Sequence, residues 1–173
     1  MRKELKVKKH TDRTDLTGEH PFGDLGQLIF LVIFILVWII DLFILKISES
    51  NYLDIPLWLL IPLGSIILVT GFYLARKSMG IIFGIKREKP ELIHEKVYDY
   101  IRHPMYLGAL LFYLGVSVIM YSVPLFILFV VIFLFYNFIV KYEEKLLLDK
   151  FGDSYALYMK KVRRWIPRIF TKK

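Results

Sequence analysis

The feature that most constrains this chain is a stretch of 36 residues, from Met105 to Val140, that contains no charged side chain. A helix that crosses the hydrocarbon core of a bilayer needs about 20 apolar residues, so this stretch has room for nearly two crossings. Its one turn-like break is the sequence Tyr121-Ser-Val-Pro124, and proline is favoured in the first turn of a helix. We therefore expect two helices, Pro104–Met120 and Val123–Lys141, that form a tight antiparallel hairpin.

Two further apolar runs precede the hairpin. The first is Leu25–Ile40, whose apolar pattern resumes after Asp41 as far as Leu45, and the second is Ile55–Ala75. The 173-residue chain is 56% hydrophobic, whereas an ordinary soluble domain is about 45–50% apolar. The sequence therefore predicts an all-α integral membrane protein with four transmembrane helices.

Lysine and arginine are distributed as the positive-inside rule requires for four spans. Six precede the first span, seven lie between the second and third, and ten follow the fourth, whereas the connection after the first span has one and the turn after the third has none. Thus 23 of the 24 basic residues lie on one side, which the rule assigns to the cytoplasm. We expect both termini to be cytoplasmic. The net charge of +8 then attracts membrane lipid headgroups, and no nucleic-acid partner is predicted.

The same pattern divides the chain into five segments. We expect a basic cytoplasmic segment at 1–24, transmembrane helices at 25–75, a cytoplasmic binding connector at 76–103, the hairpin at 104–142 and a cytoplasmic amphipathic segment at 143–173. In the last segment Gly152 is a helix stop, and Asp153 can cap a short helix. We expect this helix to lie on the membrane, with Arg163, Arg164 and Trp165 among the lipid headgroups.

The candidate chemistry begins where the connector meets the third span. His103 flanks Pro104, which fits the first helical turn, so unpaired backbone N–H groups and the positive end of the helix dipole point towards the cytoplasm. Such a helix start binds a carboxylate or a phosphate, and Arg102 and His103 add to it. The alternative is an Arg-His anchor at the membrane interface, with Tyr106 as part of a tyrosine belt.

A second polar group lies at the end of the fourth span. Asn137, Lys141 and Glu144 share one helix face, whereas Glu143 points about 100° away. At 1.5 Å per residue the hairpin helices are about 25 and 31 Å long, so the start of the third span returns to the same leaflet as the two glutamates. A cationic helix start beside paired carboxylates suits a zwitterionic ligand. The alternative is the solvated start of a cytoplasmic helix.

The chain lacks the sequence signatures of several other classes of protein. The chain has no cysteine, and His94 and His103 are nine residues apart without the spacing of paired ligands, so no metal site is predicted. There is no Walker loop, no Gly-x-Gly-x-x-Gly and no nucleophile elbow. A small transporter needs polar groups deep in several spans, and only Asp41 and Asn137 qualify.

Together these motifs resemble the superfamily of isoprenylcysteine carboxyl methyltransferases and phospholipid methyltransferases, which are integral membrane enzymes. The resemblance covers about residues 88–167 and rests on Tyr98-x-x-x-Arg102-His103-Pro104-x-Tyr106-x-Gly108, Glu143-Glu144-x-x-Leu147 and Phe151-Gly152-x-x-Tyr155-x-x-Tyr158. It implies S-adenosylmethionine as the cofactor, in a cytoplasmic pocket over the final hairpin. Carried over position by position, the cofactor-contacting residues are Leu92, Ile93, Tyr98, His103, Pro104, Met105 and Tyr106, and Glu143 is an active-site carboxylate.

The chain departs from the family pattern at three positions. Pro90 replaces a histidine, Lys96 replaces the usual glycine, and Ile139 stands where the carboxyl methyltransferases have an arginine thought to hold the substrate. The resemblance therefore implies methyl transfer more clearly than it implies a prenylcysteine acceptor. The expected function is methyl transfer to a lipidic or prenylated acceptor. The alternatives are N-methylation of an ethanolamine phospholipid and a non-catalytic membrane binding protein.

The expected catalytic residues are Arg102, Glu143 and Glu144, and the expected substrate-binding residues are Asn137 and Lys141. A carboxylate acceptor is ionised at neutral pH and needs no general base, whereas an amine must first lose a proton, for which Glu143 or Glu144 is the plausible base. The acceptor is expected to enter sideways between the third and fourth spans. The sequence leaves the oligomeric state open.

Overall fold

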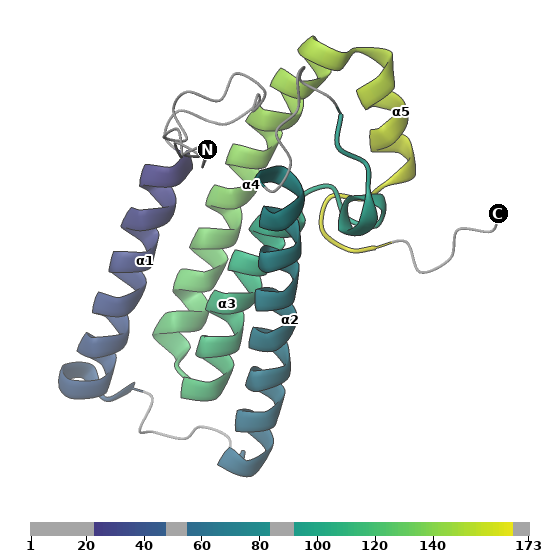
Figure 1. Ribbon diagram of the computed structural model, residues 1–173. Helices are drawn as coiled ribbons and strands as arrows, with labels where there is room; N and C mark the ends of the chain where they lie inside the picture. Colours follow the sequence, from purple (N-terminus) through teal and green to yellow (C-terminus); the bar gives the residue numbers. More distant parts are fainter. Residues whose placement is uncertain (1–22, 48–54, 84–91, 168–173) are drawn as a thin grey trace, which may run out of the picture.

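The computed structural model describes residues 23–47, 55–83 and 92–167, most of which are helical (Figure 1). The elements are α1 (Gly23–Ile40), the π-helix η2 (Asp41–Leu45), α2 (Leu57–Phe83), the 3-10 helix η4 (Lys96–Asp99), α3 (Pro104–Met120), α4 (Val123–Phe151) and α5 (Asp153–Lys161). This described part contains no strand, and its isolated bridge joins Ile101 to Arg163. The all-helical fold class predicted from the sequence is therefore confirmed.

Three of the helical stretches are long and apolar enough to cross a membrane: Leu25–Leu45, Leu57–Ile82 and Val123–Phe151. The helix α3 is also apolar but has only 17 residues. Large apolar side chains cover the outside of the bundle, and Val69 and Leu134 are more than half exposed. Soluble monomers rarely expose extended apolar patches of this kind. The chain is an integral membrane protein.

The long helices lie side by side, and α4 stands between α1 and α3 while α2 packs on the far side of α3 (Figure 1). Aromatic side chains fill the space between them. Phe34 of α1 meets Tyr113 of α3 with 4.9 Å between ring centroids, and Tyr106 of α3 meets Tyr136 of α4 at 5.4 Å. This aromatic layer holds α3 against α4 directly beneath the polar residues described below.

Glycines allow α2 and α3 to approach closely at two levels. A Cβ atom built on Gly108 would lie 2.7 Å from the carbonyl oxygen of Gly71, and one built on Gly64 would lie 2.8 Å from that of Gly115. Both distances are shorter than real Cβ atoms show, so any larger residue forces the helices apart. Small residues at helix contacts are characteristic of membrane bundles, where close backbone packing drives association. The close packing of α2 thus fixes the position of α3 and of its first turn.

Local hydrogen bonds fix the turn between α3 and α4. Tyr121 adopts a left-handed backbone with φ of 48°, and its N–H donates to the Val118 carbonyl at 3.2 Å. The Ser122 hydroxyl accepts from the Leu125 N–H at 3.4 Å and so caps α4. The same hydroxyl donates to Oδ2 of the buried Asp41 at 2.6 Å, which connects the end of α1 to the turn.

Two helices extend further than the sequence predicted. The helix α2 continues through Arg76 and Lys77 to Phe83, so the first part of the expected connector 76–103 is helical. The helix α4 continues past position 142 to Phe151, so 143–151 belong to it. Charged side chains do not by themselves end a helix, whereas Gly152, with φ of 52°, ends α4 as expected. Most of the expected segment 1–24 lies outside the described residues.

Candidate active site

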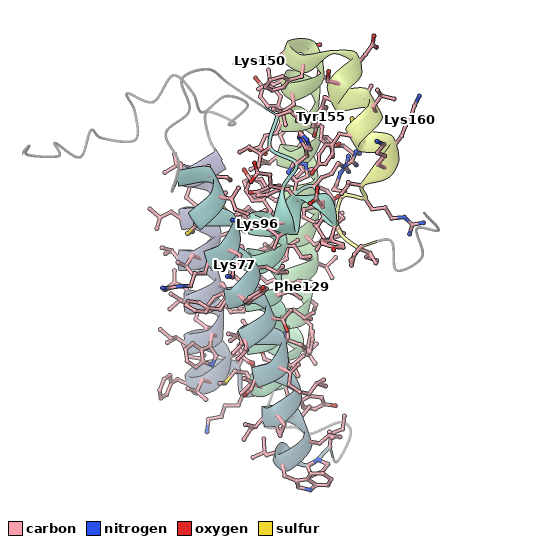
Figure 2. All side chains as sticks on the ribbon, turned by 45° about the vertical axis from the view of Figure 1, so that its right-hand side comes forward. Lys77, Lys96, Phe129, Lys150, Tyr155 and Lys160 are labelled. Carbon is pink, nitrogen blue, oxygen red and sulfur yellow. The ribbon has the colours of Figure 1, made fainter. Side chains whose placement is uncertain are left out.

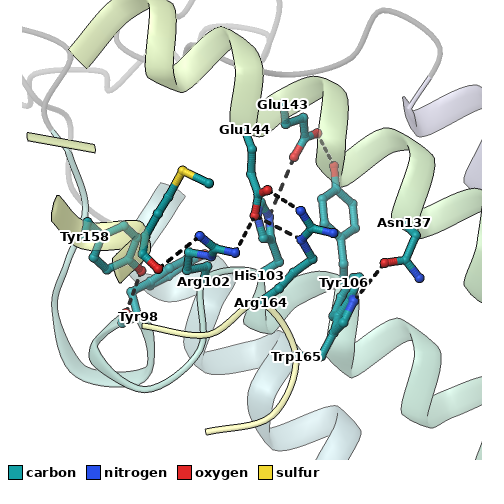
Figure 3. Close-up of polar contacts among 11 residues, drawn as sticks. Tyr98, Arg102, His103, Tyr106, Asn137, Glu143, Glu144, Tyr158, Arg164 and Trp165 are labelled. Atoms are coloured by element: carbon teal, nitrogen blue, oxygen red, sulfur yellow. Dashed lines mark hydrogen bonds and ion pairs between the residues drawn. The ribbon is translucent and has the colours of Figure 1, made fainter. Parts of the chain in front are cut away.

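The structure brings the predicted cationic and acidic residues together at one end of the bundle (Figure 3). Arg102 Nη2 lies 3.1 Å from Glu144 Oε1, and His103 Nε2 lies 3.3 Å from the same oxygen. His103 and Glu144 are buried, with 8% and 5% of their surface exposed. The start of α3 and the C-terminal half of α4 therefore meet, as the hairpin lengths predict, but they do so through direct ion pairing.

Glu143 joins the same group, although the helical spacing turns it about 100° from Glu144. The Tyr106 hydroxyl donates a hydrogen bond to Glu143 Oε1, and Glu143 Oε2 lies 3.9 Å from His103 Nδ1. The rings of His103 and Tyr106 are stacked with 6.0 Å between centroids. One carboxylate thus faces each ring nitrogen of His103, and both glutamates are buried.

A strap, residues 162–167 after α5, closes this group from the other side. Arg164 Nε donates to Glu144 Oε1 at 3.1 Å, and Arg164 Nη2 pairs with Glu144 Oε2. The strap is held in place because the Arg102 N–H donates to the Arg163 carbonyl at 3.0 Å. Trp165 Nε1 donates to Asn137 Oδ1 at 3.0 Å. The placement of Arg164 and Trp165 among lipid headgroups is therefore corrected: both side chains turn inward to partners on α4.

The residues expected to contact a cofactor surround this group unevenly. Pro104 and Met105 form the first turn of α3, and Pro104 is buried. Tyr98 is buried in η4, and its carbonyl accepts the Tyr158 hydroxyl at 2.6 Å. Leu92 packs against the buried aromatic cluster of α5, and Ile93 beside it is half-buried. The connector thus contacts α5 through Leu92 and the Tyr98 carbonyl, and it also contacts α2 through η4.

The two residues expected to bind substrate differ in their surroundings. Asn137 is half-buried, and its amide donates to the Phe133 carbonyl at 3.0 Å while its oxygen accepts from Trp165. Lys141 is exposed and takes no part in the group around His103. Asn137 and Lys141 thus differ in exposure although they lie one helical turn apart on the same side of α4.

The electrostatics of the group favour a neutral histidine. Burial lowers the pKa of His103 below its usual value near 6.5, and the charges of Arg102 and Arg164 lower it further. The hydrogen bond to Glu144 and its negative charge act in the opposite direction but do not outweigh burial. At neutral pH the ring therefore carries one proton, and its two nitrogens lie 3.3 Å from Glu144 Oε1 and 3.9 Å from Glu143 Oε2.

One donor in this group has no partner. Arg102 Nε is buried and makes no hydrogen bond to any part of the chain that the structure describes. A buried polar group without a partner costs about 1–3 kcal/mol, and more for a charged group. The helix α3 also begins without a side-chain cap, so its first N–H groups add further donors. The site is therefore equipped to hold an anionic group.

Comparison with known proteins identifies the family. A family profile described as phospholipid methyltransferase matches residues 58–154, which is more than half of the chain and runs from α2 to the start of α5. The chain belongs to the phospholipid methyltransferase family. The matched region includes α3, α4 and both glutamates of the buried group, whereas Arg164 and Trp165 lie beyond it.

Three isoprenylcysteine O-methyltransferases are similar to the chain. Protein-S-isoprenylcysteine O-methyltransferase of Schizosaccharomyces pombe is 36% identical over 97 residues, which are 55% of this chain and 41% of that protein. Protein-S-isoprenylcysteine O-methyltransferase B of Arabidopsis thaliana is 34% identical over 110 residues, 62% of this chain and 56% of that protein. Protein-S-isoprenylcysteine O-methyltransferase of Saccharomyces cerevisiae is 30% identical over 113 residues, which are 64% of this chain and 47% of that protein. The chain spans about half the length of these relatives.

The sequence reasoning missed Arg164 and Trp165 as members of the site. Their signal was present as the run Val162-Arg-Arg-Trp165 directly after α5, but spacing alone did not show which arginine turns inward. The bridge between Ile101 and Arg163 decides this, because it pairs the strap with the residue before Arg102. Such a contact between distant segments is not visible in a local pattern.

Proposed function

We propose that this chain is a membrane methyltransferase that transfers the methyl group of S-adenosylmethionine to a lipidic acceptor, in the manner of isoprenylcysteine O-methyltransferases. The observation that carries the proposal is the buried group of Arg102, His103, Glu143, Glu144 and Arg164 in a chain of this family. Membership supports the reaction type, and the group supplies a site of matching chemistry.

The residues of the site fit this cofactor. Its methionine part carries a carboxylate and an ammonium group. The unpaired Arg102 Nε and the first N–H groups of α3 suit the carboxylate, and the buried Glu143 suits the ammonium. Leu92, Ile93, Tyr98 and the first turn of α3 are the remaining candidates for contact.

S-adenosylmethionine supplies a methyl group that is already electrophilic, so the chain chiefly aligns the reactants and excludes water. Glu144 accepts from Arg102, His103 and Arg164, so its role is to position those three side chains. Two arginines beside it stabilise its anion and make it a poor base. For an amine acceptor, the general base is therefore Glu143, whose hydrogen-bond donor is the neutral phenol of Tyr106.

The membrane arrangement that we propose has four spans with both termini and the active site on the cytoplasmic side. The third of these spans, α3, has 17 residues, about 25 Å, which is at the short end of the range for a crossing helix. Its tight packing on α2 and its immediate continuation into α4 support this placement. In this arrangement α5 lies at the membrane surface, and the acceptor approaches between α3 and α4.

The acceptor that we propose first is a prenylated cysteine carboxylate, because the relatives above are named for it. Ile139, which is buried and apolar, offers no cation to such a carboxylate, and Lys141 is exposed. An ethanolamine phospholipid is therefore the second candidate acceptor. A non-catalytic binding protein on the same fold is the third possibility, and it is distinguished by experiment.

The test uses the full chain reconstituted in lipid nanodiscs with S-adenosylmethionine labelled in its methyl group. A prenylated cysteine and an ethanolamine phospholipid are offered separately, and label in the organic phase is counted. We expect label in one acceptor only. Cofactor binding without label in any lipid favours the non-catalytic alternative, and a lack of both binding and label contradicts the proposed function.

Two substitutions test the site itself by cofactor affinity. His103→Ala and Glu144→Gln each remove a partner from the buried group, so we expect at least a tenfold weaker affinity, about 1.4 kcal/mol, in each. The exposed residue Asp149 of α4 provides the matched control Asp149→Asn, which should bind as the wild type does. Unchanged affinity in both site variants would mean that the cofactor binds elsewhere.

A further inference from the structure

A second polar hollow lies on the α2 side of the molecule. It is a groove of about 830 Å³ between the last turns of α2 and the connector around η4. Arg76, Lys77 and Gly80 line it from α2, and Lys96 and Tyr100 line it from the connector. Figure 2 shows Lys77 and Lys96 on these two neighbouring elements. The groove shares no lining residue with the group around His103.

The charges in this groove are unbalanced. Arg76, Lys77 and Lys96 are exposed cations, and Glu95 is the one acid among the lining residues. Within the described ranges, none of the three cations forms an ion pair with a carboxylate. Lys77 Nζ lies over the Tyr73 ring, 5.7 Å from its centroid. The groove therefore presents unpaired positive charge between aromatic side chains, which suits an anion.

The glycine contacts of α2 and α3 show at which level of the bundle the groove lies. Gly71 lies opposite Gly108, and the two helices are antiparallel. Arg76 is five residues after Gly71, and His103 is five residues before Gly108. Because the helices are antiparallel, Arg76 lies level with His103 at the start of α3. The cations thus lie where the apolar part of the bundle ends, at the depth of lipid headgroups. Basic pockets between membrane helices at this depth bind the headgroups of anionic lipids.

Lys96 provides an independent observation. Its φ is 56°, in the left-handed region that a residue with a side chain adopts only against strain. Glycine is the residue that suits this conformation. Strained residues persist where the surroundings hold them, and they cluster at functional positions. Here the strained position carries a cation into the groove, opposite those of α2.

We propose that this groove is a phosphate-binding site that holds the headgroup phosphate of an anionic phospholipid from the cytoplasmic leaflet. Arg76 has the fork of N–H groups that binds two phosphate oxygens, and Lys77 and Lys96 add point charges. Gly80 leaves the wall of the groove open, because a Cβ atom there would meet nothing within 4 Å. The site is separate from the proposed methyl transfer and does not depend on it.

The decisive variant is Lys96→Gly. It removes one cation and also relieves the left-handed strain, so the fold is retained or stabilised and a loss of binding is not an effect of unfolding. The full chain is released from nanodiscs of equal phosphatidylglycerol and phosphatidylcholine, and the lipids retained are counted by native mass spectrometry. We expect retained phosphatidylglycerol to fall about fivefold, as for one cation near an anionic surface. Arg76→Gln with Lys77→Gln should lower it further.

Lys150→Gln is the matched control, because Lys150 is an exposed cation of α4 outside the groove. We expect Lys150→Gln to retain as much phosphatidylglycerol as the wild type. The proposal is overturned if Lys96→Gly and Lys150→Gln retain equal amounts. Added inorganic phosphate identifies the source of the phosphate. If the lipid stays bound, the ligand is the headgroup, and if the lipid is displaced, the site takes soluble phosphate as well.

Discussion

At the scale of single residues, the site is organised around His103. Its two ring nitrogens face the carboxylates of Glu143 and Glu144, and Arg102 and Arg164 neutralise the second of these. The meeting of Arg102 with Glu144 was predictable from helix lengths alone, because an antiparallel hairpin returns the chain to its starting level. The inward turn of Arg164 was not, because it depends on a backbone contact between residues 102 and 163.

The lowered pKa of His103 predicts how stability depends on pH. The unfolded chain binds a proton at this histidine below about pH 6.5, whereas the folded chain does not until a lower pH. The contribution of His103 to stability is therefore fully present above pH 6.5 and is lost progressively as the pH falls below it. We expect the thermal unfolding midpoint in detergent to decrease from pH 7 to pH 5.

His103→Gln should remove that part of the decrease, because glutamine does not titrate. His94→Gln should retain it, since His94 is exposed. A pH dependence that is the same in both variants would show that another group causes it.

At the scale of elements, close packing of α2 on α3 supports the site. The level of the start of α3 is set by the pairs Gly71–Gly108 and Gly64–Gly115, which hold the two backbones in contact. The existence of both helices was predictable from their apolar runs. The extension of α2 to Phe83 was not, because Arg76 and Lys77 resemble the end of a span while the helix continues beyond the hydrocarbon region.

Two glycine-to-alanine substitutions are expected to have opposite effects on stability. Alanine in a helix interior is normally favoured over glycine by about 1 kcal/mol. Gly80→Ala should therefore raise the unfolding midpoint, because its new Cβ meets no atom within 4 Å. Gly108→Ala places a Cβ 2.7 Å from the Gly71 carbonyl oxygen and should destabilise by about 1–3 kcal/mol, the usual cost of overpacking.

Thermal unfolding of both variants in the same detergent checks this contrast. If Gly108→Ala is as stable as Gly80→Ala, α2 and α3 are further apart than the structure has them.

At the scale of the whole molecule, the polar residues are concentrated at one end of an apolar bundle. Figure 1 shows α5, η4 and the strap on one side of the C-terminal half of α4, while the opposite end of the bundle holds η2 and the turn before α4. The sequence predicted this asymmetry through its basic residues, since charges outside the spans are easy to count. The sides of the membrane remain a prediction of the positive-inside rule.

The absence of cysteine allows a direct test of that orientation. Lys46→Cys and Lys150→Cys each introduce a single thiol, one at each end of the bundle, at exposed positions. We expect a membrane-impermeant maleimide to label Lys150→Cys only from the cytoplasmic face and Lys46→Cys only from the opposite face. Labelling of both thiols from one face would contradict the four-span arrangement.

The strap has a consequence for how the protein is made. Arg164 follows Glu144 by 20 residues and lies after the last helix long enough to span the bilayer. Because the chain is synthesised from its N-terminus, all of α4 is made before Arg164. Until then Glu144 can pair only with Arg102 and His103, which were translated earlier. The buried acid–base group is therefore completed only by a residue that is synthesised after the whole of α4.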